Sequence, residues 1–280
     1  MDAPHDHDDP HDRGLQFDLS TLTGLLRRRR VLGLFAGAGA VAALAACGTD
    51  DATGAAAPEA EPTASPSTSG STSYTEIPEE TAGPYPGDGS NGPNVLTQSG
   101  IVRSDITTSF GSASGVAKGV PLTINLTVLN LDNGAAAHTG AAVYLWHCDM
   151  DGQYSMYSNA AKNENYLRGV QEANATGLVT FRSIFPAAYS GRWPHIHFEV
   201  YPTLSSATSA GNKITTSQLA LPEAVCSTVY ASDGYSSSVR NMAQTSLTSD
   251  NVFRDGWTTQ LATVTGSVDA GYVANLTVPV

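Results

Sequence analysis

The chain has 280 residues, of which 41% are hydrophobic and 14% are charged, and its formal net charge at pH 7 is −12. An acidic surface repels the phosphate backbone of DNA or RNA, so this balance argues against a nucleic-acid-binding protein. The length allows one or two domains, but the first quarter of the chain does not have the composition of a globular protein.

Residues 1–46 are predicted to be an export signal. Consecutive arginines at 27–30 directly precede residues 31–46, which carry no charge. This order is typical of export signals, and the arginines followed by Val31 and Leu32 fit a twin-arginine pattern. The apolar part is short and rich in Ala and Gly, which disfavours a transmembrane helix. We therefore expect an exported protein.

The end of this signal predicts a lipid anchor. Leu44-Ala45-Ala46-Cys47 resembles the lipobox of bacterial lipoproteins, in which cleavage precedes a cysteine that becomes lipidated. Cys47 would then hold the protein at the extracellular face of the cell membrane, and that anchor would be its sole contact with the membrane. The alternative is an ordinary secretory signal with an incidental cysteine, which predicts a secreted protein.

Residues 47–74 are predicted to be a flexible tether. Between Gly48 and Ser73 the sequence consists of Ala, Thr, Ser, Pro, Gly and acidic residues, with no aromatic side chain. Such a segment cannot bury enough apolar surface to offset the entropy lost on ordering it. One folded domain is therefore expected over residues 75–280.

Short runs of β-branched, aromatic or alternating residues follow one another through this domain. The strand candidates are residues 122–128, 141–147, 178–184, 194–201, 214–221, 261–268 and 272–278. Glycine-containing turns lie between several of them, and residues 237–246 suggest one short helix. This pattern predicts an all-β fold, an antiparallel β-sandwich core with long loops and little helix.

The segment Tyr189–Val200 concentrates side chains that can carry chemistry. In a strand, His195, His197 and Glu199 share one face, while the apolar residues between and after them share the other. Two neighbouring imidazoles are half of a metal site, yet no histidine follows them in the sequence. A zinc site built from three histidines would lack a ligand here. The site must therefore draw on oxygen donors.

Tyrosines in two segments could supply these oxygens. One is Tyr189, and the other is Tyr154, in a turn that follows a predicted strand. A phenolate is a hard anion and suits a hard trivalent ion. Holding one tyrosine ionised at pH 7 costs about 4 kcal/mol, which a highly charged cation can supply. Ferric iron therefore fits two phenolates and two imidazoles.

Several blocks of residues in this order resemble the intradiol ring-cleaving catechol dioxygenases, the family that includes protocatechuate 3,4-dioxygenase and catechol 1,2-dioxygenase. The blocks are ETAGPY at 80–85, VYLWHCD at 143–149, GQYS at 152–155, YLRG at 166–169, TFRSI at 180–184, Pro186 and Tyr189–Val200. The resemblance spans roughly residues 79–221. It implies a β-sandwich with one non-haem Fe(III), bound by Tyr154, Tyr189, His195 and His197.

The resemblance also implies a reaction and further roles. A catecholic substrate would be cleaved by O2 between its two hydroxyl-bearing carbons, giving a cis,cis-muconate-type product. Tyr189 would give up its place at the metal and help to take a substrate proton. Arg192 would stabilise negative charge on the substrate ring, and Gln218 would orient that arginine. The choice among catechol, protocatechuate, hydroxyquinol and caffeate stays open, as does the oligomeric state.

Other aromatic and histidine residues receive simpler interpretations. Tyr85 is expected to line the mouth of the substrate pocket. Tyr157 and Tyr166 are expected to be packing or pocket-wall residues, because the set of four ligands is already complete. His147 is expected to be a hydrogen-bonded core residue or to support the site from behind its ligands.

The cysteines predict a disulfide. If Cys47 is lipidated, Cys148 and Cys226 are the two that remain, and an even pair in an exported chain is often oxidised. The alternative is two separate buried thiols.

Two rival functions stay open. One is a non-catalytic, cell-surface β-sandwich module that binds aromatic or polysaccharide material. The other is a metal-dependent hydrolase with a three-ligand site.

Overall fold

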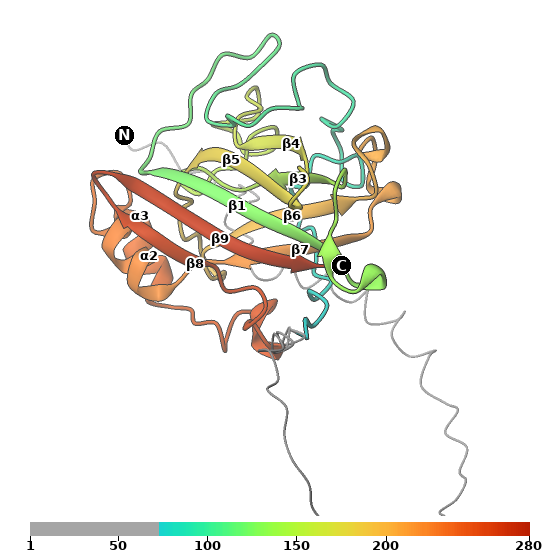
Figure 1. The fold of residues 1–280 in the computed structure, drawn as a ribbon. Helices are drawn as coiled ribbons and strands as arrows, with labels where there is room; N and C mark the ends of the chain where they lie inside the picture. The colour runs from blue at the N-terminus through green and yellow to red at the C-terminus, as the bar shows by residue number, and fades with distance from the viewer. Residues whose placement is uncertain (1–72) are drawn as a thin grey trace, which may run out of the picture.

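The computed structural model describes residues 73–280, which are coloured in Figure 1. The predicted export signal, Cys47 and all but the last two residues of the predicted tether lie outside the described residues. Within residues 73–280, no helix has the length and apolar character needed to cross a membrane.

Five strands form the first sheet. They are β1 (Pro121–Asn130), β2 (Ala136–Ala137), β5 (Leu178–Ile184), β8 (Thr263–Ser267) and β9 (Gly271–Pro279). In the centre, β1 pairs antiparallel with β5 and parallel with β9, while β2 and β8 add antiparallel pairs to β1 and β9. The parallel β1–β9 pair departs from the predicted antiparallel arrangement. It can form because a long excursion of the chain, rather than a hairpin, connects the two strands.

The second sheet lies behind the first in Figure 1 and is antiparallel throughout. Its strands, in spatial order, are β4 (Arg168–Glu172), β3 (Ala142–Trp146), β6 (His195–Tyr201) and β7 (Thr215–Ala220). The helices are α2 (Glu223–Tyr230) and α3 (Ser236–Met242), and the 3-10 turns are η2 (Leu131–Asn133), η3 (Leu204–Ser206), η4 (Ala210–Asn212) and η5 (Phe253–Asp255). The predicted all-β sandwich is confirmed.

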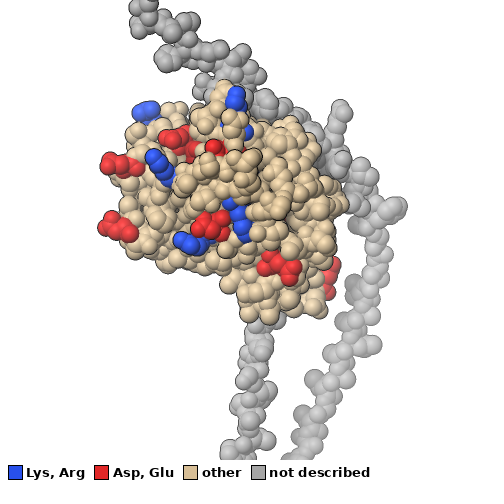
Figure 2. Space-filling view, turned by 90° about the horizontal axis from the view of Figure 1, so that it is seen from above, with Lys and Arg blue, Asp and Glu red and all other residues tan. Residues whose placement is uncertain are grey.

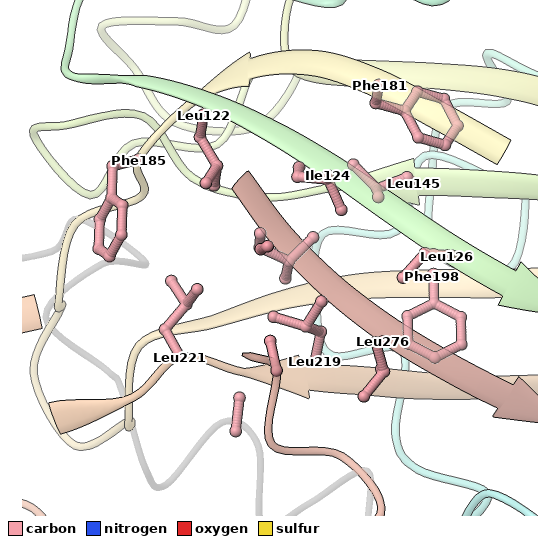
Figure 3. Packing of buried hydrophobic residues seen from close by; sticks show 14 of the residues in the cluster. Leu122, Ile124, Leu126, Leu145, Phe181, Phe185, Phe198, Leu219, Leu221 and Leu276 are labelled. Carbon is pink, nitrogen blue, oxygen red and sulfur yellow. The ribbon is translucent and has the colours of Figure 1, made fainter. Parts of the chain in front are cut away.

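The apolar faces of the two sheets meet in one core, shown in Figure 3. Leu122, Ile124 and Leu126 of β1 lie in the same cluster as Phe198 of β6 and Leu219 of β7, and all five are at most 1% exposed. Burying one such side chain contributes about 1.5–3 kcal/mol. This packing fixes the apolar side of β6 and so determines where its opposite side stands.

The opposite side of the second sheet is also covered. Every residue of β3, β6 and β7 is buried, although a strand at the surface of a sandwich usually alternates between buried and exposed residues. Tyr144 and Trp146 of β3 pack there against Val95 and Leu96, which come from the long segment that precedes β1. The polar face of β6 is therefore covered by protein rather than exposed to solvent.

The predicted disulfide between Cys148 and Cys226 is wrong. Both cysteines are buried free thiols, as the alternative interpretation held. The Sγ of Cys148 lies 3.6 Å from the carbonyl oxygen of Ala187, and the thiol of Cys226 interacts with the hydroxyl of Tyr230. Burial raises the pKa of both thiols above the ordinary value, which keeps them protonated and unreactive.

Charged side chains are sparse on the face shown in Figure 2, where acidic and basic groups are scattered over a larger uncharged surface. An exposed pair such as Arg182–Asp105, at 3.5 Å, contributes less than about 1 kcal/mol. Other charged groups lie inside the domain. Arg168, Arg192, Glu199 and Asp250 are each at most 1% exposed.

Candidate metal centre

Strand β6 places His195 and His197 side by side on the enclosed face. The predicted alternation is present, because the apolar residues of β6 enter the core between the sheets while the two histidines point the other way. In the sheet, His197 pairs with Trp146 on β3 and with Gln218 on β7. The rings of Trp146 and His197 stack at a centroid distance of 4.9 Å. The Trp146 ring on β3 thus holds this imidazole in place.

Four donor atoms converge beside β6. The hydroxyl oxygens of Tyr154 and Tyr189 are 3.5 Å apart, the hydroxyl of Tyr189 is 3.1 Å from Nε2 of His195, and the Nε2 atoms of His195 and His197 are 3.1 Å apart. Neighbouring ligands of one ion, each about 2.0–2.1 Å from it, are separated by about 3.0–3.4 Å. The spacing of the four atoms therefore suits a single metal ion.

The tautomer of His195 also suits metal binding. Its Nδ1 lies 2.5 Å from the carbonyl oxygen of Trp193. A carbonyl oxygen can accept a hydrogen bond but cannot donate one, so Nδ1 carries the proton and Nε2 presents its lone pair to the cluster. The Nδ1 of His197 is buried and has no hydrogen-bond partner among residues 73–280. Unsatisfied buried groups of this kind are rare and often mark functional sites.

The chemistry of the donors narrows the choice of ion. Among the described residues, no three His, Cys, Asp or Glu side chains gather in a way that could hold a metal. An ion in this cluster must therefore take oxygen from the tyrosines. A hard, highly charged cation meets that requirement, and two imidazoles with two phenols fit ferric iron.

The electrostatic environment favours neutral histidines and penalises a free phenolate. Burial, followed by the nearby Arg192 charge, lowers the pKa of His195 well below 6.5, and burial together with His195 and Arg192 does the same for His197. Burial, with a contribution from Tyr189, raises the pKa of Tyr154 well above 10. The imidazoles are thus ready to bind a metal at neutral pH. The Tyr154 phenol would ionise at neutral pH once a bound cation stabilised its negative charge.

Arg192 is fixed by a buried network next to the histidines. Its Nη2 donates to Oε1 of Gln218 at 2.6 Å, and its Nε donates to Oδ2 of Asp250 at 3.0 Å. Gln218 in turn donates to the carbonyl oxygen of Thr81 at 2.9 Å. The same Oδ2 of Asp250 accepts a hydrogen bond from the backbone N–H of Trp193 at 2.6 Å. The structure thus brings Gln218 to Arg192, and it adds Asp250.

Sequence reasoning missed Asp250. It lies 58 positions after Arg192, in a segment without any motif. Its Oδ1 accepts hydrogen bonds from the backbone N–H groups of Val252 and Phe253, so the carboxylate also organises the turn that contains it. A buried arginine usually has a buried acidic partner, and this tendency was the one signal that the sequence offered.

The remaining predicted aromatic residues surround the cluster at different distances. The ring of Tyr85 lies 4.9 Å from the ring of Tyr154, a candidate ligand, and the ring of Tyr157 lies 5.3 Å from that of Tyr85. Tyr166 instead donates its hydroxyl to Oδ2 of Asp149 at 3.0 Å and packs in a separate small cluster.

His147 is held by two hydrogen bonds and is not among the converging donors. Its Nδ1 donates to the carbonyl oxygen of Cys148 at 2.7 Å, and its Nε2 accepts from the hydroxyl of Ser183 at 2.7 Å. Burial is the main cause that lowers its pKa from 6.5 to about 4. The imidazole is therefore neutral in the folded protein at pH 7.

The pKa of His147 predicts loss of stability in acid. Between pH 6.5 and 4 the unfolded chain takes up a proton that the folded protein does not. The free energy of unfolding should therefore fall by about 3 kcal/mol from this group alone and level off below pH 4. In metal-free protein, urea unfolding at pH 7 and pH 4 should show a loss about 3 kcal/mol smaller for H147Q than for wild type, because the buried His195 and His197 contribute equally to both. Parallel pH profiles would contradict the prediction.

Comparison with known proteins supports the fold. No protein-family model and no curated protein matches the sequence. An intradiol ring-cleavage dioxygenase from Tetranychus urticae is 23% identical, with a TM-score of 0.57 over 74% of this chain and 94% of that chain. A second solved dioxygenase is 23% identical, with a TM-score of 0.58 over 73% of this chain and 93% of that chain. The domain therefore has the fold of the intradiol ring-cleavage dioxygenases.

Proposed function

We propose that this protein is an Fe(III)-dependent dioxygenase that cleaves a catechol-type aromatic between its two hydroxyl-bearing carbons. The observation that carries the proposal is the convergence of four donor atoms, from Tyr154, Tyr189, His195 and His197. Each of these atoms lies 3.1–3.5 Å from the next one in that order. The fold shared with intradiol dioxygenases supports it. Both oxygen atoms of O2 would enter the product, a cis,cis-muconate-type dicarboxylic acid.

The proposed roles follow from the position of each residue. The four ligands would hold ferric iron, which would supply Lewis-acid chemistry for the reaction of the catechol with O2. Tyr189 is only partly buried, unlike Tyr154 at 1% exposure, so it is the tyrosine better able to move aside for substrate. Its phenolate oxygen would take a proton from the arriving substrate hydroxyl and become a neutral phenol.

Arg192 would act on the substrate ring. Its guanidinium is held in one orientation by Asp250 and Gln218, so its positive charge is already in place when negative charge develops on the ring. Tyr85 and Tyr157 would form an aromatic wall that accepts a flat ring. The burial of the histidines would keep bulk water from the reacting atoms.

The test is oxygen uptake by purified protein after loading with iron. We expect about one iron per chain, a visible phenolate-to-iron colour that changes when substrate is added, and O2 consumption with at least one of catechol, protocatechuate, hydroxyquinol and caffeate. Labelled O2 should place both labelled atoms in the product. Colourless protein that binds no iron would favour a non-catalytic module for aromatic or polysaccharide material, and activity with zinc alone would favour a hydrolase.

We also propose that the enzyme works outside the cytoplasm as a lipoprotein. The arginines at 27–30, the uncharged residues 31–46 and Cys47 support this location. Cells that express the full chain should incorporate labelled fatty acid into wild type and not into C47S. Unlabelled wild-type protein in the culture medium would instead indicate an ordinary secretory signal.

A further inference from the structure

Arg168 is the first residue of β4, and its side chain is 1% exposed. A guanidinium has five N–H donors in a planar fork, and each of these five has an acceptor here. The acceptors are the Ser155 hydroxyl at 3.0 Å, the Ser155 carbonyl at 2.9 Å, the Pro86 carbonyl at 2.8 Å, the Tyr144 hydroxyl at 2.9 Å and the Tyr85 carbonyl at 2.9 Å. The charge is thus satisfied by neutral oxygens.

These acceptors belong to two segments that carry residues of the candidate site. Ser155 directly follows Tyr154, a candidate metal ligand, and Arg168 binds both its hydroxyl and its carbonyl oxygen. On the other side, the bonds to Tyr85 and Pro86 hold the segment whose aromatic ring lies 4.9 Å from that of Tyr154. A single side chain therefore joins the residue that follows a candidate metal ligand to the segment that carries the Tyr85 ring.

The surroundings of Arg168 are shaped for its guanidinium. Gly87 has a positive φ of 68°, and a Cβ at that position would lie 2.8 Å from Nη1 of Arg168. The hydroxyl of Tyr157 accepts a hydrogen bond from the backbone N–H of Gly87 at 2.8 Å, and the Tyr157 ring lies 5.4 Å from the guanidinium carbon. Gly87 therefore leaves room for the guanidinium, and Tyr157 contacts both Arg168 and the segment that carries Tyr85.

Arg168 differs from an apolar residue in what it bonds and not in the space that it fills. Burying a cation is costly, and none of the acidic side chains among residues 73–280 forms an ion pair with Arg168. An apolar side chain of similar volume could fill the space. An apolar side chain could not, however, form hydrogen bonds with two backbone segments, as the planar guanidinium does.

We propose that Arg168 is a positioning residue that sets the separation between the Tyr154 phenol and the Tyr85 ring, and so determines both the strength of metal binding and the width of the substrate pocket. This inference rests on the proposed function for its metal and substrate. Its structural part, the Tyr85–Tyr154 contact, can be measured without either.

The first test uses metal-free protein. In wild type, the two rings at 4.9 Å should give aromatic proton cross-peaks by NMR. R168M, which keeps most of the side-chain volume but has no donors, should lose them. R168K, which keeps the charge without the fork, should lose or weaken them. The matched control is R182M, which removes an arginine whose side chain is 74% exposed and should leave the contact unchanged.

The second test uses iron. R168M and R168K should bind Fe(III) about 10–100-fold more weakly than wild type, with a shifted phenolate-to-iron absorption band and a changed ratio of KM values for catechol and caffeate. R182M should stay within about twofold of wild type. If R168M does not fold, S155A replaces it, because that change removes the hydroxyl acceptor beside Tyr154 and should weaken iron binding in the same direction.

The outcomes separate the two proposals. Wild-type protein that develops neither colour nor oxygen uptake contradicts the proposed function, whatever the variants do. Wild-type protein that does both, together with folded R168M and R168K that keep the ring contact, the absorption band and the KM ratio, overturns the role of Arg168. Lower thermal stability in these variants, with every site measurement unchanged, would also overturn it, because a purely structural role predicts that result.

Discussion

Replacing Tyr154 with phenylalanine should abolish oxygen uptake and weaken the phenolate-to-iron colour, which Tyr189 alone would then supply, while leaving the metal-free domain intact. The substitution removes one hydroxyl from a buried ring whose oxygen has one long contact, 3.5 Å to Tyr189. Little stability depends on that contact, so the free energy of unfolding without metal should change by less than about 1 kcal/mol. Iron affinity should fall at least about 100-fold, because a charged ligand is lost. Iron titration and urea unfolding measure the two effects.

A matched control is Y235F, which also removes a hydroxyl from a buried tyrosine. Tyr235 donates to the carbonyl oxygen of Phe185 at 2.8 Å and accepts from the N–H of Val120 at 3.1 Å, outside the candidate site. Y235F should therefore lose about 1–3 kcal/mol of stability and keep its iron and activity. Y154F is thus expected to lose iron affinity and keep its stability, whereas Y235F is expected to lose stability and keep its iron affinity. Wild-type colour and oxygen uptake in Y154F would remove Tyr154 from the ligand set.

Asparagine in place of Asp250 should damage both the fold and the reaction. The substitution leaves the Arg192 charge buried without its carboxylate, and breaking one partner of a buried pair usually costs about 3–5 kcal/mol. Arg192 would also lose the bond that fixes its Nε side, so kcat with the preferred substrate should fall at least about tenfold. Iron binding should change less than kcat, because Asp250 contacts Arg192 and the backbone of Trp193 and none of the four candidate ligands.

The control for this prediction is D105N. Asp105 pairs with Arg182 at 3.5 Å, but both side chains are exposed, so the loss should be less than about 1 kcal/mol. Urea unfolding of the two variants compares a buried and an exposed pair in the same domain. D250N with wild-type stability and wild-type kcat would show that Arg192 does not depend on this carboxylate.

Periodicity in the sequence predicted the strands because it reflects burial directly. Residues 122–128 alternate between apolar and polar side chains, and β1 buries the former and turns the latter outward. The His-x-His pattern on β6 was predictive for the same reason, since a period of two puts both imidazoles on one face. A helix expected at residues 237–246 corresponds to α3, which is shorter and ends at Met242.

Other features depend on contacts between distant segments and leave little trace in local sequence. Strand β4 reads RGVQE, which has too few apolar residues to show alternation, and α2 contains two valines and two threonine or serine residues that favour strands or turns. The positions of Asp250 and Arg168 against their partners follow from tertiary packing. The disulfide prediction failed because it considered the number of cysteines and not the separate partners of Cys148 and Cys226.

The parallel pairing of β1 with β9 has a consequence for how the protein is made. Leu122 and its partner Tyr272 are 150 positions apart, so the first sheet cannot be completed until almost the whole described domain has been translated. At a translation rate of about 5–20 residues per second, β9 is synthesised roughly 8–30 s after β1. Long-range pairing of this kind also slows folding.

The candidate ligands are all synthesised before that moment. His197, the last of them, precedes β9 by about 70 residues, and β6 depends for its position on a core that β1 and β9 complete. A nascent or truncated chain would therefore carry every donor atom and still hold iron poorly. Insertion of the metal is expected to follow release of the finished chain from the ribosome, so that metal loading marks molecules that have folded completely.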